Sequence, residues 1–251
     1  MMEKVSHKDM LEAGVHFGHL KRKWNPKMLP YIFAERKGIH LIDLNKTSES
    51  LEEAAHAVRQ IVKSGRKVLF VATKKQAKEV VKAEAQRANM PYVTERWLGG
   101  MLTNFATIRR SVKKMESIRK LLDDKSTTSL TKKERLLLGR QLQKLSMVLG
   151  GIENLNRVPS AVYVVDITYE DIAIKEAKKL GIRTLGMVDT NSNPNSINFP
   201  IPSNDDAANS IQLITRYLAD AAIAGSKDRA QMKEESAKSE EKAPSEEKAA
   251  E

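Results

Sequence analysis

Cationic and aromatic side chains alternate in one stretch near the amino terminus, from Gly14 to Leu44. Between Gly14 and Lys37 the only acid is Glu35, and the net charge is +5. Cations bind phosphate groups, and flat rings stack on unpaired bases. The rings that lie between the cations are His16, Phe17, His19, Trp24, Tyr31 and Phe33. Glycines and prolines interrupt any long helix here, as is typical of a segment shaped to an irregular surface. The stretch predicts an RNA-binding arm.

A second group of donors surrounds Gly99-Gly100 and the expected beginning of a helix. It contains Arg96, Asn104, Arg109 and Arg110. Because helix amino termini attract phosphates, this group is a further candidate for RNA contact. A solvated basic loop is the plain alternative for Lys21, Arg22 and Lys23. Trp24 and Trp97 could equally be anchors of the hydrophobic core.

Catalytic chemistry finds little support in the chain. There is no G-x-G-x-x-G, no G-x-x-x-x-G-K-[ST] and no G-x-S-x-G, and the chain lacks cysteine. Asp166 and Asp189 follow expected strands, where α/β enzymes place ligands. Capping of the segments DITYED and DTNSNP is a better explanation for them than a magnesium pair. We therefore expect no catalytic role and no cofactor.

The histidines offer only a weak metal signal. His16 and His19 are three residues apart, but the sequence shows no third or fourth ligand beside them. His7, His40 and His56 follow no partner pattern. RNA hydrogen bonding or loop packing is the favoured role, and no metal site is expected.

The elements that must position these residues alternate between strands and helices. Continuous apolar runs indicate buried strands, and apolar residues at helical spacing indicate helices between them. Strands are expected at 39–44, 67–72, 90–93, 161–166, 183–188 and 197–201, the last at a sheet edge because prolines bound it. Helices are expected at 45–64, 74–88, 172–180 and 205–224, with Ser203 as the cap of the last. This alternation predicts an α/β fold: a three-layer, flavodoxin-like or Rossmann-like parallel sheet whose strand order the sequence does not give.

One segment interrupts the alternation, from 105 to 151, and is too long for an ordinary loop. Two narrow apolar stripes predict an inserted antiparallel helical hairpin, a coiled-coil protrusion with its turn at 123–131. Its net charge is +8. The stripes are Ile108, Val112, Met115, Ile118 and Leu122 in the first helix and Leu138, Leu142, Leu145 and Leu149 in the second. We expect the hairpin to carry little of the main core.

Composition supports a polyanion partner. The 251 residues carry a formal net charge of +11, although the last 26 have a net charge of −2. That tail, 226–251, has almost no large apolar residue, so disorder is expected, with a solvated helix as the alternative. The amino terminus lacks the features of a secretory signal or transit peptide, and no apolar run is long enough to cross a bilayer. A soluble, cytoplasmic protein is expected.

Three motifs carry a resemblance to a known family. GVHFGH, WNPKM and YIFAERKGIHLIDL between Gly14 and Leu44 resemble the amino-terminal signature of bacterial ribosomal protein S2. RWLGGMLTNFATIR, from Arg96 to Arg109, is similar to a second motif of that family, and VYVVDI with GMVDTNSNP resembles its last two core strands. The matches cover residues 5 to 224. The resemblance implies the flavodoxin-like strand order and a coiled-coil protrusion at 105–151.

The resemblance also implies a function. It predicts a structural constituent of the small (30S) ribosomal subunit that binds 16S ribosomal RNA between head and body. Neighbouring small-subunit proteins, including the large mRNA-capturing one, are the other implied partners. A nucleotide-binding enzyme and a coiled-coil protein adaptor stay open as alternatives. The expected RNA-binding residues are Lys21, Arg22, Lys23, Trp24, Lys27, Arg36, Arg96, Asn104, Arg109, Arg110, Lys113 and Lys114.

These interpretations divide the chain into four parts. Residues 1–38 form the RNA-binding arm, and residues 39–104 and 152–225 form the α/β sheet domain. Residues 105–151 form the inserted hairpin, and residues 226–251 form the charged tail.

Overall fold

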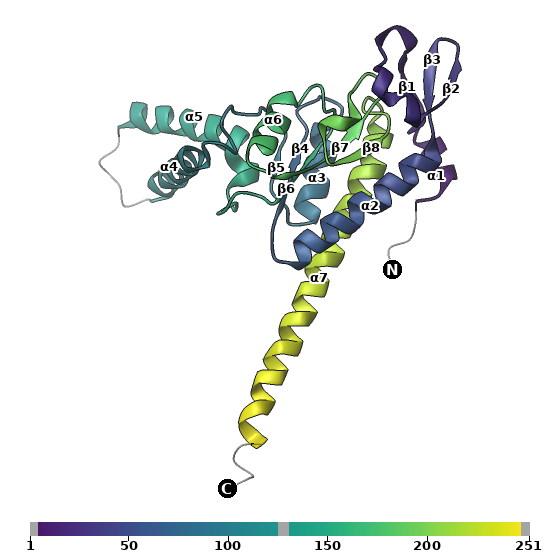
Figure 1. Cartoon of the computed structure of the whole chain (residues 1–251). Helices are drawn as coiled ribbons and strands as arrows, with labels where there is room; N and C mark the ends of the chain where they lie inside the picture. The colour runs from purple at the N-terminus through teal and green to yellow at the C-terminus, as the bar shows by residue number, and fades with distance from the viewer. Residues whose placement is uncertain (1–4, 125–130, 247–251) are drawn as a thin grey trace.

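A five-stranded parallel sheet lies at the centre of the computed structural model (Figure 1). The structure describes residues 5–124 and 131–246, with side chains to residue 232 and at 234. The strand order is β5-β4-β6-β7-β8, which is the flavodoxin-like order 2-1-3-4-5 that the resemblance implies. The strands are β4 (Val68–Val71), β5 (Tyr92–Val93), β6 (Ala161–Val164), β7 (Arg183–Val188) and β8 (Phe199–Pro202). The three-layer α/β prediction is confirmed, and the proline-bounded strand lies at the edge as expected.

Continuous apolar runs in the central strands arise because both faces of the sheet are buried. In β4, Val68 and Phe70 belong to one buried cluster, whereas Leu69 and Val71 belong to the other. The first face packs against α2 (Leu44–Lys63), α3 (Lys78–Arg87) and α7 (Ala208–Glu246). The second packs against α6 (Asp171–Lys179) and the beginning of α4 (Phe105–Asp123). The carboxyl and amino edges of the sheet, where its strands end and begin, remain for polar chemistry.

A small antiparallel sheet forms the arm, with the order β1-β3-β2. Its strands are β1 (Phe17–Leu20), β2 (Ile32–Arg36) and β3 (Ile39–Ile42), and it follows α1 (His7–Glu12). The short helices η1 (Lys21–Lys23) and η2 (Pro26–Tyr31) connect β1 to β2. Lys37 and Gly38 make the β2–β3 turn with φ of 52° and 76°, a two-residue hairpin that favours glycine. The segment 39–42 therefore belongs to the arm and not to the main sheet.

The interruption at 105–151 contains α4 and α5 (Lys132–Leu149), which pack on each other. The turn expected at 123–131 lies mostly outside the described residues. Ile108, Val112 and Met115 of α4 are buried in the same cluster as Leu69 and Val71 of β4. The expectation that this segment carries little of the main core is wrong, because the first half of α4 covers one face of the sheet.

The last helix, α7, runs to Glu246 and includes most of the segment expected to be disordered. The structure thus contains the alternative, a solvated helix, between 226 and 246. Contacts with α2 stabilise the beginning of this helical segment. Asp228 accepts two hydrogen bonds from the Arg59 guanidinium of α2, at 2.7 and 3.0 Å. Gly225 lies against the Arg59 backbone, so the two helices cross closely there. Ser203 does not cap α7; its hydroxyl donates to the Ile201 carbonyl, and Asn204 accepts from the amides of Asp206 and Ala207.

Candidate nucleic-acid interface and the carboxyl edge of the sheet

The arm exposes most of its cations. Lys21 pairs at 2.6 Å with Glu35, the only acid between Gly14 and Lys37. The side chains of Arg22, Lys23, Lys27 and Arg36 are exposed, and they have no ion-pair partner among the described residues. Free cations on a compact sheet can bind phosphates without first breaking an internal pair.

Aromatic side chains of the arm divide into two kinds. Trp24 is half-buried, and its ring lies 5.3 Å from the ring of His40, tilted by 46°. Trp24 therefore packs partly inside the protein, which agrees in part with the alternative that it is an anchor of the core. Phe33 is 75% exposed, beside a small groove lined by Leu11, Leu41 and Leu44. The sequence marked Phe33 only as one ring of several, because the alternation of β2 does not show which face is covered.

Backbone hydrogen bonds attach the arm to the carboxyl edge of the main sheet. The His19 amide donates to Thr190 Oγ1 at 2.8 Å, and the Asn25 amide donates to the Thr190 carbonyl at 2.8 Å. The amide of Asn204 donates to the Val15 carbonyl at 3.1 Å. Gly18 fits only because it lacks a side chain: a Cβ there would lie 2.6 Å from the Thr190 methyl group. The arm is thus fixed by residues that lie far away in the sequence.

Lys74 occupies the crevice where flavodoxin-like folds usually bind ligands. Its ammonium group lies 3.2, 2.8 and 2.6 Å from carboxylate oxygens of Asp166, Asp205 and Asp206. Burial lowers the pKa of Lys74, but hydrogen bonds to Asp205 and Asp206 outweigh burial and the net shift is upward. Burial and the charges of Asp166 and Asp189 raise the pKa of Asp205 to about 7. The crevice is filled by an internal ion-pair network.

Asp166 and Asp189 cap the segments that follow them, as the sequence favoured. Asp166 Oδ1 accepts from the amides of Thr168 and Tyr169, each at 3.0 Å, and Asp189 Oδ1 accepts from the Thr190 hydroxyl at 3.1 Å. The second oxygen of each carboxylate faces the network around Lys74 and His19. Their position at the strand ends therefore serves the fold.

His19 acquires ligand-like neighbours that its spacing from His16 could not reveal. His19 Nδ1 lies 2.9 Å from Asp189 Oδ2, and Nε2 lies 3.4 Å from Asp206 Oδ2. The hydrogen bond to Asp189 raises the pKa of His19 against the effect of burial. One atom each of His19, Asp205 and Asp206 lie within 4.8 Å of one another. One nitrogen and two carboxylate oxygens form a donor set that suits zinc better than magnesium. The sequence does not reveal this cluster, because Asp205 and Asp206 lie far from His19 along the chain and are typical of the beginning of a helix.

The RWLGG loop is held by one buried acid, Glu176 of α6. Its carboxylate accepts hydrogen bonds from Trp97 Nε1 at 3.1 Å and from the backbone amides of Gly100, Leu102 and Thr103 at 2.7, 3.0 and 3.1 Å. Burial raises the pKa of Glu176, but these hydrogen bonds outweigh burial and lower it. Trp97 is a core anchor. Glu176 shares a helix face with Ala173 and Ala177, a weak signal that the sequence reading passed over.

The predicted residues of the second group are exposed with one exception. Arg96, Asn104, Arg110, Lys113 and Lys114 lie in the RWLGG loop and along α4. Arg109 is half-buried, and it donates to the Glu153 carbonyl at 2.8 Å and to Asn156 Oδ1 at 2.9 Å. Arg109 thus braces the end of the segment that returns to the sheet. The arm and the α4–α5 pair lie at opposite ends of the molecule, so the predicted residues form two separate surfaces (Figure 1).

The fold and these surfaces define a class: an α/β protein with a self-filled ligand crevice, no phosphate loop in its sequence, and two exposed cationic surfaces. No helix in the described parts of the chain is both long and apolar enough to span a bilayer.

Comparison with known proteins agrees with this class. Residues 10–225 match the family model described as "Ribosomal protein S2". A relative named "Small ribosomal subunit protein uS2" from Cytophaga hutchinsonii is 59% identical over 236 residues, 94% of this chain and 93% of that protein. Proteins of the same name from Bacteroides thetaiotaomicron and Flavobacterium johnsoniae are 56% and 55% identical, over 91% and 94% of this chain and 82% and 93% of theirs.

The chain belongs to the ribosomal protein S2 family. It is a structural protein of the small ribosomal subunit that serves translation on the cytoplasmic ribosome, and it is not an enzyme. The resemblance found in the three sequence motifs is confirmed, and the enzyme alternative is excluded.

Proposed function

We propose that the chain binds 16S ribosomal RNA between the head and body of the small subunit, with the arm as its principal contact. The observation that carries this proposal is the set of exposed, unpaired cations on the arm: Arg22, Lys23, Lys27 and Arg36. Arg96, Arg110, Lys113 and Lys114 supply a second contact along α4. Lys21, Trp24, Asn104 and Arg109 remain candidates, although Lys21 and Arg109 also have internal partners.

Salt dependence of binding tests the arm. The triple substitution Lys23→Ala, Lys27→Ala and Arg36→Ala should weaken binding to a 16S ribosomal RNA transcript and flatten the log–log salt dependence by roughly 0.7 to 0.9 per lost phosphate contact. A matched control removes three exposed cations elsewhere, by Lys75→Ala, Arg216→Ala and Lys227→Ala. An equal effect of both triples would mean that only net charge matters, and the arm would lose its assigned role.

Docking of a neighbouring small-subunit protein, such as the large mRNA-capturing one, is the second part of the proposal. Its support is the exposed apolar surface of the arm, where Leu29 is 64% and Phe33 75% exposed, beside the groove of Leu11, Leu41 and Leu44. Apolar surface of this kind marks contact with protein more than with phosphate.

Phe33→Ala separates this docking from RNA binding. The variant should enter 30S subunits normally, while those subunits should retain less of the mRNA-capturing protein after sedimentation. Phe17→Ala, a second exposed ring of the arm outside the groove, is the control. Retention that is unchanged in Phe33→Ala would contradict the docking role. Retention of the neighbour by the free chain after RNase treatment would favour the adaptor alternative over RNA binding.

A further inference from the structure

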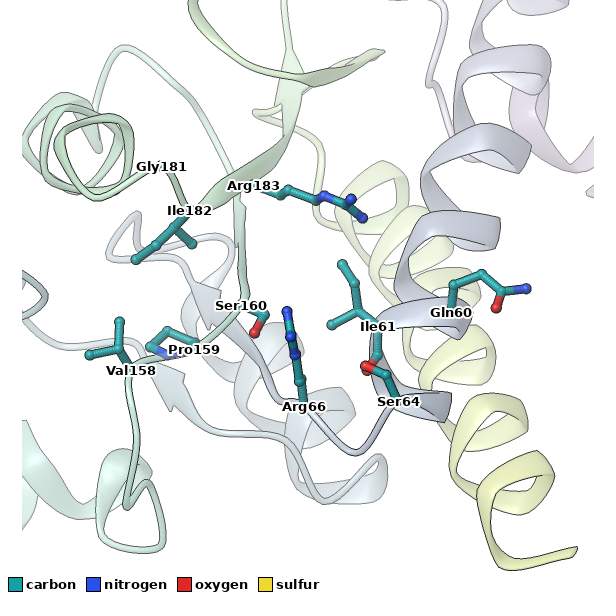
Figure 2. A pocket seen from close by; sticks show the side chains of 10 residues that line it. All are labelled: Gln60, Ile61, Ser64, Arg66, Val158, Pro159, Ser160, Gly181, Ile182 and Arg183. Atoms are coloured by element: carbon teal, nitrogen blue, oxygen red, sulfur yellow. The ribbon is translucent and has the colours of Figure 1, made fainter. Parts of the chain in front are cut away.

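A pocket of about 410 Å³ opens at the end of the sheet opposite the arm (Figure 2). It lies where β6 and β7 begin, beside the last turn of α2. Its charged lining consists of Arg66 and Arg183, and none of the described residues that line it is an acid. Ser64, Ser160 and Gln60 add hydroxyl and amide groups. Figure 2 shows both arginine side chains in the space between α2 and the strand ends. We refer to it as the arginine pocket.

The arginines of this pocket differ from others in the protein. Arg59, Arg87 and Arg119 each form an ion pair with a carboxylate, at 2.6 or 2.7 Å. The side chains of Arg66 and Arg183 are exposed and have neither an ion pair nor a hydrogen bond with any described residue. Two free guanidinium groups in one concavity repel each other unless an anion lies between them.

A second hollow of about 320 Å³ adjoins the first and shares Arg66, Val158 and Ser160 with it. It adds Lys67 and Arg157, and the part of the chain that the structure describes again contributes no acid to the lining. Burial, together with the charge of Arg229, lowers the pKa of Lys67, as expected where positive potential accumulates. The two hollows therefore form one continuous cationic surface.

Helix dipoles do not account for these charges. The carboxyl termini of α2 and α6 lie here and favour cations, but each already has lysine in its last turn: Lys63 in α2, and Lys178 and Lys179 in α6. Arg66 follows the end of α2, and Arg183 begins β7. They are additional charges that point into the hollow instead of along a helix.

We propose that the arginine pocket is a further RNA-binding surface, in which Arg66 and Arg183 bind phosphodiester groups of one ribosomal RNA strand. The planar guanidinium group donates two parallel hydrogen bonds to a phosphate, and an acid-free hollow lets a phosphate approach without repulsion. Arg157 continues the path for the adjacent phosphate, and Lys67, whose ammonium group donates to the Asn89 carbonyl at 2.6 Å, adds positive charge beside it. The inference rests on the proposed RNA-binding function and adds to it an independent contact at the amino edge of the sheet.

Binding to a 16S ribosomal RNA transcript, measured across a range of salt concentrations, tests the proposal. The double variant Arg66→Ala/Arg183→Ala should bind at least threefold more weakly and lose about 1.5 units of log–log slope, since two phosphate contacts are removed. The control Lys75→Ala/Arg216→Ala removes the same charge from exposed positions outside both hollows and should change the slope little. Arg66→Lys/Arg183→Lys keeps the charge and should retain the slope but lose part of the affinity.

Stability separates a binding role from a structural one. The double alanine variant should keep its melting temperature within about 2 °C, because exposed substitutions without partners cost little. A large fall in melting temperature with unchanged RNA affinity would assign the arginines to the fold and overturn the proposal. If the arm triple weakens binding and the pocket double does not, the proposed function survives and this inference fails. If neither does, both fail.

A positional test uses the absence of cysteine from the chain. Ser64→Cys places one thiol at the rim of the arginine pocket, where a tethered iron chelate can generate hydroxyl radicals. In reconstituted 30S subunits this chelate should cleave 16S ribosomal RNA at a discrete site. Failure to cleave, with normal incorporation of the protein, would show that no RNA strand passes the pocket.

Discussion

Glu176 is a buried acid whose role in the protein is to organise backbone. Its two oxygens accept from four nitrogen donors of the RWLGG loop, and the Thr103 hydroxyl lies 3.2 Å away. Among the described residues, Glu176 is the acceptor for each of these four nitrogen donors. The RWLGG motif is thus a loop wrapped around one carboxylate, with Arg96 exposed at its rim.

Glu176→Gln should destabilise the protein by about 2–4 kcal/mol, because the amide NH2 group would face backbone donors and leave some of them unsatisfied. Denaturant unfolding measures this loss. Asp171→Asn, which changes an exposed acid of the same helix, is the control and should stay within about 0.5 kcal/mol.

The same substitution should alter the pH dependence of stability. The pKa of Glu176 is lowered in the folded protein from its ordinary value of 4.5. Its ionised form therefore contributes fully above pH 4.5, and this contribution is lost as the pH falls through the lower, folded pKa. The stability difference between the original protein and Glu176→Gln should be constant near neutral pH and shrink in acid. A difference that persists unchanged below the folded pKa would contradict this explanation.

His19, Asp205 and Asp206 make a second residue-scale prediction. Their donor atoms converge, and Asp189 orients the imidazole in the way that carboxylates orient zinc-bound histidines. Zn²⁺ binding here requires that the metal displace the Lys74 ammonium group from Asp205 and Asp206. The chain should then bind about one Zn²⁺ in preference to Mg²⁺, measured by elemental analysis after dialysis. His19→Ala should abolish it, whereas His56→Ala, on the exposed face of α2, should not. Equal zinc content in the two variants would refute the site.

At the scale of elements, the sequence identified strands and helices well where burial was uniform. The run KVLFVA predicts a strand with two covered faces, and β4 has them. Boundaries were wrong where tertiary contacts decide. The segment 39–44 looks like any other short strand, and only its pairing with β1 and β2 assigns it to the arm. A sequence does not distinguish a free cation, such as Arg22, from one with internal hydrogen bonds, such as Arg109.

The first half of α4 is buried against the sheet, whereas the outer part of the interrupting segment is exposed. Substitutions in the two parts should therefore differ in their effect on stability. Met115→Ala should cost about 2–4 kcal/mol, because Met115 is fully buried against the sheet cluster. Leu136→Ala, on α5 where the side chain is 55% exposed, should cost less than about 0.5 kcal/mol. Thermal unfolding compares them. Equal, small effects would restore the view that this segment is independent of the core.

The crossing of α2 and α7 depends on Gly225. Alanine favours a helix over glycine by about 1 kcal/mol. A Cβ at this position, however, would lie 2.5 Å from the Arg59 carbonyl oxygen, which is backbone and cannot rotate away. The overlap should cost about 1–3 kcal/mol, so Gly225→Ala should be neutral to destabilising despite its propensity. A clear gain in stability would show that the helices separate easily.

For the whole molecule, the arm is joined to the sheet by buried Met10, Val15 and Met28, which belong to the two core clusters, and by a few polar contacts. Thr190 is fully buried and accepts from the His19 amide through its hydroxyl. Thr190→Val keeps the shape and removes this acceptor. Amide exchange should accelerate through the arm while the amides of β4 keep their protection. Uniform acceleration in both would mean that the arm and sheet unfold together.

The attachment of the arm has a consequence for the order in which this chain can mature. Its first forty residues leave the synthesising ribosome early, but Thr190 and Asn204, to which they are fastened, are translated near the end. A nascent arm is therefore cationic and unanchored for most of its synthesis, and it acquires its fixed orientation only when the final strand has emerged. Under the proposed RNA-binding role, commitment to the RNA site becomes a late event, reserved for chains in which Thr190 and Asn204 have already been translated.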